Sequence, residues 1–191
     1  MNKPPPFQCT ARRSVFENSR FNIHADTLVQ EDGYRVNDYL VVEPQQSNAE
    51  GLTGVMILPE AEGKFFLLRI YRHPIKKWGW ELPGGFMENE ALHLAAHREL
   101  REETGLECHP KDLINLGETA PCPGVVNGRI AMFVAKNCTH VGPPTDTQEP
   151  GLGQGKWMDQ KELVGLMARP DGIQDAVTMM MILLYLQKEA A

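Results

Sequence analysis

The stretch RELREETGL, residues 98–106, constrains the fold and chemistry of this chain more than any other segment. It has the composition of the last turns of a helix, and Gly105 is the residue type expected at a left-handed helix stop. Glu99, Glu102 and Glu103 nevertheless crowd this end, where the helix dipole already contributes partial negative charge. Each acid there costs about 0.3–1 kcal/mol, so the segment calls for a cation nearby.

A helical projection of residues 90–106 places these acids on the inward face. At about 100° per residue, one side of the helix carries a line of four residues: Leu92, Ala95, Ala96 and Glu99. Glu102 and Glu103 flank that line and so extend the apolar face. Mg²⁺ and Mn²⁺ choose oxygen ligands, and a bound cation reverses the electrostatic penalty. The alternative is a solvated helix end with Arg98 and Glu102 as an i, i+4 ion pair.

The segment KKWGWELPGGFMENE, residues 76–90, precedes this helix. We predict a loop here, because Pro83, Gly84 and Gly85 disfavour regular structure. Glycines also let backbone carbonyls point into a site and let a phosphate approach closely. Trp78 and Trp80 could stack on a nucleobase or pack in the core or an interface.

Written out, the pattern is Gly84-x5-Glu90-x7-Arg98-Glu99-Leu100-x-Glu102-Glu103-x-Gly105-Leu106. It resembles the signature box of the Nudix hydrolases, which cleave nucleoside diphosphates linked to another moiety. Nine specified positions agree at fixed spacing, but GGFMENE is one residue shorter than the usual Gly-Gly-x-x-Glu-x-Gly-Glu. The pattern therefore starts at Gly84, and either Gly84 or Gly85 would offer its carbonyl to a metal.

Two further segments resemble the ADP-ribose pyrophosphatase branch of that family. IYRHP followed by WELPGG is similar to its QYR-x-P and Glu-Leu-Pro-Ala-Gly segments, and Pro121 lies where the branch tends to carry a proline. The resemblance implies that Arg72 and Glu81 contact the substrate; ordinary surface pairing is the alternative. It also implies that a small β appendage at the N-terminus contributes to a homodimer.

The same resemblance implies the roles of the acids. Glu99 and Glu103 would be the first metal ligands, with Glu102 a third ligand or a base. Arg98 would orient one of these acids, and Glu90 would act chiefly through the helix dipole. The general base would be Glu149, in the acid-poor loop TDTQEPGLGQGKW, unless it is a solvated loop acid.

The rest of the chain reads as alternating strands and helices after an extended KPPPF tail. We expect strands within residues 21–29, 33–44, 54–60, 64–72, 113–119 and 129–137. Helices are expected over about 90–104, 161–168 and 174–188. We predict an α/β fold, the Nudix α/β/α sandwich with a mixed, curved sheet. Residues 1–45 would form the tail and β appendage, and residues 46–191 the hydrolase domain.

The composition of the chain limits which partners, cellular location and metal sites we expect. The net charge of −6 argues against a surface that binds nucleic-acid phosphates independently of sequence, so we expect no nucleic-acid partner. The terminal apolar run AVTMMMILLYL is too short to span a bilayer. The four cysteines form no C-x-x-C pair, which favours reduced thiols in a cytoplasmic protein. A zinc site at Cys108, His109 and Cys122 fits no standard spacing, and His93 and His97 fall on the outer helix face, as surface histidines.

Together these features predict a pyrophosphohydrolase that depends on Mg²⁺ or Mn²⁺. Its substrate would be a nucleoside diphosphate derivative, with ADP-ribose or an ADP-sugar favoured. The alternative from another class is a noncatalytic Nudix domain that binds a nucleotide and regulates a partner. A third hypothesis is an isopentenyl-diphosphate isomerase, a Nudix relative that rearranges its substrate and does not hydrolyse it. Nothing outside the box supports this hypothesis.

Overall fold

The computed structural model describes residues 4–146 and 150–189. Contacts within the chain divide it into two compact units, each considered separately below. The first comprises residues 1–53 and 120–129, and the second residues 54–119 and 130–191. The predicted division at residues 45 and 46 stays a prediction.

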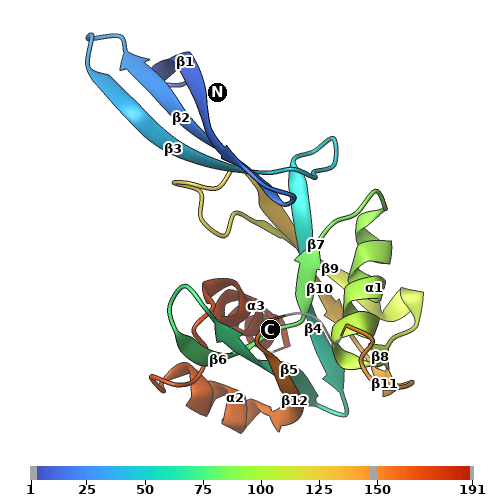
Figure 1. The fold of residues 1–191 in the computed structure, drawn as a ribbon. Coiled ribbons are helices and arrows are strands. Elements are labelled where there is room, and N and C mark those ends of the chain that lie inside the picture. The colour runs from blue at the N-terminus through green and yellow to red at the C-terminus, as the bar shows by residue number, and fades with distance from the viewer. Residues whose placement is uncertain (1–3, 147–149, 190–191) are drawn as a thin grey trace. The chain divides into compact units, whose positions relative to one another are not determined.

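The first unit is built on a three-stranded antiparallel sheet (Figure 1). Its strands are β1 (Phe7–Glu17), β2 (Phe21–Gln30) and β3 (Arg35–Pro44), in the order β1-β2-β3. The strands β2 and β3 match the two that were expected. Strand β1 was not predicted, because all its residues are exposed and no buried face imposes an alternating pattern on them.

The segment from residue 120 to 129 belongs to this first unit. The Val42 amide donates to the Val125 carbonyl at 2.8 Å, and the Asn127 amide donates to the Val42 carbonyl at 2.9 Å. This loop, which is rich in Pro and Gly, therefore runs alongside β3 and forms one isolated parallel β-bridge with it, between Val126 and Val42.

The second unit has a mixed α/β fold with a mixed sheet, as predicted. The strands run in the order β12-β5-β4-β10-β9, with β6 added beside β5 and β7 beside β4. Their bounds are β4 Leu52–Ala61, β5 Lys64–Arg72, β6 Lys77–Glu81, β7 Gly84–Phe86, β9 Leu113–Thr119, β10 Arg129–Ala135 and β12 Leu152–Asp159. A separate two-stranded ladder joins β8 (Leu106–Glu107) to β11 (Thr139–His140), and a short 3₁₀ turn covers Pro110–Asp112.

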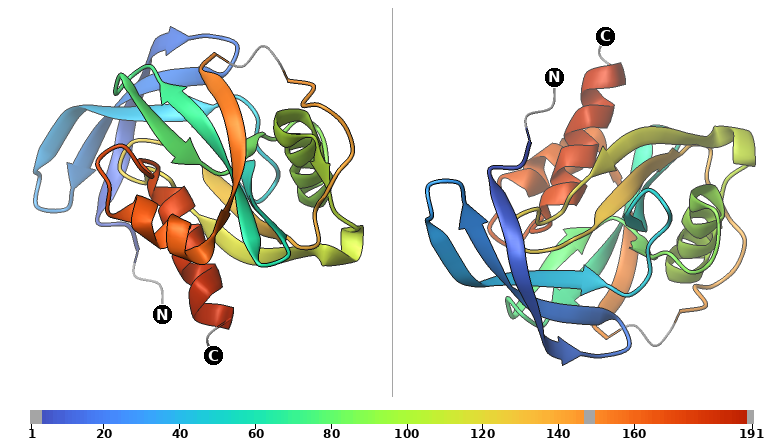
Figure 2. Two further views of the ribbon diagram at one scale, coloured as in Figure 1. Left: turned by 90° about the horizontal axis from the view of Figure 1, so that it is seen from below. Right: turned by 90° about the horizontal axis from the view of Figure 1, so that it is seen from above.

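Three α-helices occur in the described residues of this unit: α1 (Leu92–Thr104), α2 (Gln160–Met167) and α3 (Ala176–Glu189). Helix α1 lies on one side of the sheet, and α2 and α3 lie on the other (Figure 2). Helix α1 begins two residues later than expected, within the usual uncertainty of helix ends.

The main core lies between the sheet and the two C-terminal helices. Side chains of β4, β5, β10 and β12 pack there against α3, which contributes Val177, Met181, Ile182 and Tyr185. This burial explains the apolar character of α3. None of the described helices is both long and apolar enough to cross a membrane.

The prediction of an irregular loop over residues 76–90 was wrong for the two stretches that form strands, whereas residues 82–83 and 87–90 are irregular. Residues 77–81 form β6 on β5, and residues 84–86 form β7 on β4. A Cβ atom at Gly84 would lie 2.4 Å from the Val55 carbonyl oxygen, and one at Gly54 would lie 2.6 Å from the Gly85 oxygen. Gly84, which had suggested a loop, and Gly54 of β4 are therefore what allow β4 and β7 to pair so closely.

Candidate active site

The C-terminal half of α1 carries the predicted acids on its buried face. Glu99 is 8% exposed and Glu103 is 4% exposed, whereas the Glu102 side chain keeps 39% of its surface. Gly105 ends the helix with φ 68°, and its amide donates to the Arg101 carbonyl. The projection thus predicted the inward face correctly for Glu99 and Glu103.

Both buried carboxylates meet the backbone of β7. The Gly84 amide donates a hydrogen bond to Glu103 Oε2 at 2.8 Å. A Cβ atom at Gly85 would lie 2.4 Å from Glu99 Oε1 and 2.7 Å from Oε2. Only a glycine therefore leaves room for the Glu99 carboxylate in this position, and the two glycines bring α1 onto β7.

Arg98 links the acids to one another. Its Nε and Nη2 donate to Glu90 Oε1 at 2.9 and 2.8 Å. Its Nη1 donates to Glu99 Oε1 at 2.9 Å and to Glu102 Oε2 at 3.0 Å, and Nη2 also reaches the Phe86 carbonyl at 3.2 Å. Burial opposes the charge on Arg98, but its hydrogen bonds to Glu90 and the charge of Glu99 raise its pKa above the ordinary value.

The oxygen ligands in this arrangement are of the type that a divalent cation prefers, although they do not form a closed coordination sphere. No group of three His, Cys, Asp or Glu side chains converges as a metal site in residues 4–146 and 150–189. Arg98 and the Gly84 amide hold carboxylate oxygens of the cluster instead. Three carboxyl groups, those of Glu90, Glu99 and Glu102, nevertheless share one guanidinium. Carboxylate and carbonyl oxygens are also the ligands that Mg²⁺ and Mn²⁺ prefer. The residues present therefore fit such an ion.

Comparison with known proteins agrees with this geometry. The sequence profile of the NUDIX domain matches residues 52–179, which include the glycine pair, α1 and the strands around them. This chain belongs to the Nudix family. The segment from Gly84 to Leu106 is called the Nudix box below.

Curated relatives of this Nudix chain include hydrolases of nucleotide derivatives. A CMP-5'-(N-acetyl-N-hydroxy-3-aminopropyl)phosphonate hydrolase of Streptomyces rubellomurinus is 32% identical over 60% of this chain and 55% of that protein. An ADP-ribose pyrophosphatase of Mycobacterium tuberculosis is 32% identical over 47% of this chain and 43% of that protein. The chain thus spans about half the length of the curated relatives it matches.

A solved structure shares the fold over the whole length. The crystal structure of an ADP compounds hydrolase superposes with a TM-score of 0.80 and 20% identity. The match covers 100% of this chain and 97% of that one. It therefore includes the first unit as well as the Nudix domain.

The predicted substrate residues Arg72 and Glu81 form one pair on the sheet. Arg72 donates to both Glu81 carboxylate oxygens, at 2.8–3.1 Å. Glu81 is 3% exposed, whereas the Arg72 side chain is 45% exposed. Arg72 thus shields a buried carboxylate and still presents part of its surface to solvent.

Trp80 lies on the opposite face of β6 from Glu81, because neighbouring residues of a strand alternate. It packs against the core beside α3, with the Arg69 guanidinium 5.5 Å from its ring centre. Trp78 is 45% exposed and lies 5.6 Å from the Tyr71 ring. Trp80 thus packs partly against the core, while its contact with a substrate stays a prediction. The pair Arg72–Glu81 lies on the other side of the sheet.

Glu149, the predicted general base, lies outside the described residues. The segment that precedes it is hydrogen-bonded to the Nudix box. The Thr145 and Asp146 amides both donate to the Glu102 carbonyl at 2.9 Å. The loop therefore leaves from the same helix end that carries the acids.

The histidines of α1 differ from each other. His93 is exposed as expected, but His97 is only partly exposed, and its Nε2 has no hydrogen-bond partner among the described residues. Burial lowers the pKa of His97, and the neighbouring His93 lowers it further. The described residues also contain no zinc cluster at Cys108, His109 and Cys122.

Two features of the site were not visible in the sequence. Glu90, expected to act through the helix dipole, precedes α1 and binds Arg98 directly. Gly54 lets β4 approach β7. Neither the separation of eight residues nor a lone strand glycine signals such a contact, since both depend on tertiary pairing.

Proposed function

We propose that this chain hydrolyses the pyrophosphate bond of a nucleoside diphosphate linked to another moiety, with Mg²⁺ or Mn²⁺ as cofactor. The observation that carries the proposal is the buried pair Glu99 and Glu103 against the Gly84–Gly85 backbone. Positive charge stabilises such a cluster of acids at the negative pole of a helix; Arg98 supplies part of it, and a bound cation would supply the rest.

In this proposal Glu99, Glu103 and Glu102 hold the cation, together with the carbonyl of Gly84 or Gly85. When bound, the cation would neutralise phosphoryl oxygens and lower the pKa of a bound water. Arg98 is a positioning residue, since it aligns Glu99 and Glu102 through one nitrogen. Glu102 or Glu149 would accept the proton from the attacking water.

For the substrate, we propose ADP-ribose or an ADP-sugar. The names of the Mycobacterium tuberculosis relative and of the structural neighbour, both hydrolases of ADP compounds, support this class. Arg72 would contact the substrate through its exposed part while Glu81 fixes its orientation. We further propose a homodimer formed through residues 1–45, and a cytoplasmic location.

A substrate panel tests the activity. Purified protein would be incubated with ADP-ribose, nucleotide sugars, diadenosine polyphosphates and NADH, with and without Mg²⁺, and the products separated by ion-exchange chromatography. We expect metal-dependent cleavage of at least one ADP derivative. Ligand binding without turnover of any compound would favour the noncatalytic, regulatory Nudix domain instead.

The variant Glu103→Gln assigns that activity to the site. Removing one carboxylate charge should lower turnover by orders of magnitude while the fold is kept. Glu107→Gln is the matched control, because Glu107 is an exposed acid just beyond the helix, paired with Arg101. Near-normal turnover of Glu103→Gln would refute the ligand assignment, and an unchanged rate in Glu149→Gln would remove Glu149 as the base.

A further inference from the structure

Two cysteines lie opposite each other directly beyond the Nudix box. The ladder between β8 and β11 pairs Leu106 with His140 and Glu107 with Thr139 in antiparallel register. Cys108 directly follows β8 and Cys138 directly precedes β11, so the same register, extended by one residue beyond the ladder, places them opposite each other. Directly opposed side chains of an antiparallel pair point to the same side.

The hydrogen-bond phase of this ladder brings the two backbones close. The Val141 amide donates to the Gly105 carbonyl at 3.0 Å, so residues 105 and 141 form a hydrogen-bonded pair. Because the two kinds of pair alternate, 107 with 139 is hydrogen-bonded and 108 with 138 is not. The Cys138 amide indeed turns away, to the Glu60 carbonyl of β4 at 3.0 Å.

This geometry matches the requirement of a disulfide. Cα atoms of non-hydrogen-bonded pairs lie about 4.5 Å apart. Disulfides join Cα atoms about 4.4–6.8 Å apart. The opposed position therefore needs little backbone movement to close.

The surroundings keep both thiols protonated and slow to react. Cys138 is 6% exposed and its thiol donates to the Ala135 carbonyl at 3.1 Å, whereas Cys108 is partly exposed. Burial raises the pKa of Cys108 to about 11 and that of Cys138 to about 12, and the neighbouring Cys108 adds to the second shift. Such thiols react only under sustained oxidation, with Cys108 the more accessible one.

We propose that Cys108 and Cys138 form a reversible intramolecular disulfide when the protein meets a small-molecule disulfide. The Cys108 thiol loses its proton and attacks one sulfur of the reagent, which releases one small thiol and leaves a mixed disulfide. The Cys138 thiol then loses its proton and attacks the Cys108 sulfur, and a second small thiol leaves. The reagent is reduced to two thiols, and the two cysteines are oxidised.

The bond would fasten two segments that meet at the Nudix box. Cys108 follows α1 and β8, and Cys138 precedes β11 and the segment whose Thr145 and Asp146 amides bind the Glu102 carbonyl. The disulfide would thus tie the helix end that carries the acids to the segment leading to Glu149.

The test uses oxidised glutathione and intact-mass analysis. The variant Cys9→Ser with Cys122→Ser leaves only the opposed pair, and peptide mapping of the unaltered chain serves as a second measurement. We expect a product that has lost two hydrogen atoms and carries no glutathione, with residues 108 and 138 in one cross-linked peptide. Adding Cys138→Ser should stop the reaction at a stable glutathione adduct on Cys108.

A urea-unfolded sample, in which both thiols are accessible, confirms that the reagent is active. Native protein that keeps both thiols free after prolonged exposure, while the unfolded sample oxidises, would overturn the proposal. A glutathione adduct that accumulates on Cys108 beside an unreacted Cys138 would overturn it equally. These measurements do not use enzymatic activity, so they stand apart from the proposed hydrolysis.

Discussion

Arg98 donates hydrogen bonds to carboxyl groups of Glu90, Glu99 and Glu102, which would otherwise repel one another. Lysine has one ammonium group and could not reproduce this fork. The guanidinium also binds the Phe86 carbonyl, so a single side chain connects α1 with β7 and with the residues that precede the helix. Its role in the cluster is therefore both electrostatic and geometric.

Arg98→Met should lower the free energy of unfolding by about 1–3 kcal/mol, because it leaves the buried Glu99 carboxylate without this partner. The methionine keeps most of the apolar stem, so lost packing contributes little. Urea denaturation followed by circular dichroism measures the change.

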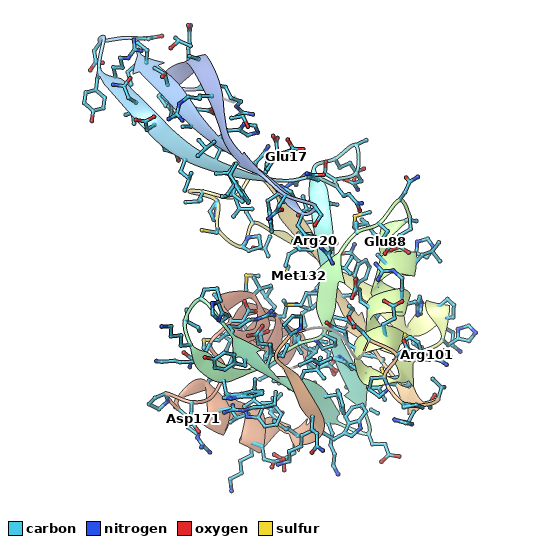
Figure 3. The ribbon with its side chains drawn as sticks, in the orientation of Figure 1. Glu17, Arg20, Glu88, Arg101, Met132 and Asp171 are labelled. Carbon is cyan, nitrogen blue, oxygen red and sulfur yellow. The ribbon has the colours of Figure 1, made fainter. Side chains whose placement is uncertain are left out.

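Arg101→Met is the matched control on the same helix. Arg101 lies on the side of α1 turned away from β4 (Figure 3), and it pairs with the exposed Glu107. This variant should change the free energy of unfolding by less than about 0.5 kcal/mol. Equal effects of the two substitutions would show that Arg98 makes no special contribution.

Gly85→Ala should abolish most turnover of the substrate found in the panel. The added Cβ would lie 2.4 Å from Glu99 Oε1, so the carboxylate must move. Steady-state rates at saturating Mg²⁺ measure the loss, which we expect to be at least about a hundredfold, as for small displacements at active sites.

Gly165→Ala provides the control for that substitution. Gly165 lies inside α2, and a Cβ there meets no atom within 4 Å. Alanine should leave turnover unchanged and raise stability by about 0.5–1 kcal/mol, because glycine is a poor helix former. If Gly85→Ala kept the rate of Gly165→Ala, the packing of Glu99 on the glycine would be irrelevant to function.

At the scale of elements, local periodicity predicted the helices and strands that have one buried face. The helix α1 shows this best, since the projection placed Glu99 and Glu103 inward and both are buried. The strand β1 shows the limit, since every one of its residues is exposed and it is defined by pairing with β2. The strands β6 and β7 were mistaken for a loop because a glycine pair usually indicates a turn. Here Gly84 is instead needed for the close approach of the β4 backbone, which the sequence alone does not reveal.

The site residues likewise divide into those that a local pattern predicts and those that depend on tertiary neighbours. The acids on α1 could be predicted from a spacing of one helical turn, because that spacing fixes their direction. The Arg98–Glu90 contact and the inward packing of Trp80 depend on which strands and loops become neighbours. No local pattern in the chain encodes those neighbours.

The N-terminal sheet should lose stability in acid. Arg12 donates to both Asp26 carboxylate oxygens at 2.8 Å, and this hydrogen bonding lowers the pKa of the Asp26 carboxyl from its unfolded value of 3.8. A lowered folded pKa means that the stabilisation is complete above the unfolded value. It is lost as the pH falls through the lower folded value.

Arg12→Gln tests this pH dependence. The difference in unfolding free energy between the unaltered chain and the variant should be largest near neutral pH and should shrink below about pH 4. Urea titrations between neutral pH and pH 2 give the curve. A difference that stays constant over that range would show that the ion pair does not titrate in the folded state.

At the scale of the whole molecule, the net charge of the chain and the charge of the acids on α1 have the same sign. The chain carries a net charge of −6 and would repel an anionic diphosphate at long range. The acids of α1 add to that repulsion unless a cation occupies them. Substrate binding and metal binding are therefore expected to depend on each other, with nucleotide affinity higher when Mg²⁺ is present.

Binding of Mn²⁺, followed by electron paramagnetic resonance of the free ion, tests whether the acids at the end of α1 hold a divalent metal. We expect the unaltered chain and Glu107→Gln to bind Mn²⁺. The double variant Glu99→Gln with Glu103→Gln should lose this binding while keeping its circular dichroism spectrum. Equal Mn²⁺ binding by the double variant and the unaltered chain would contradict the assignment of the metal to this helix end.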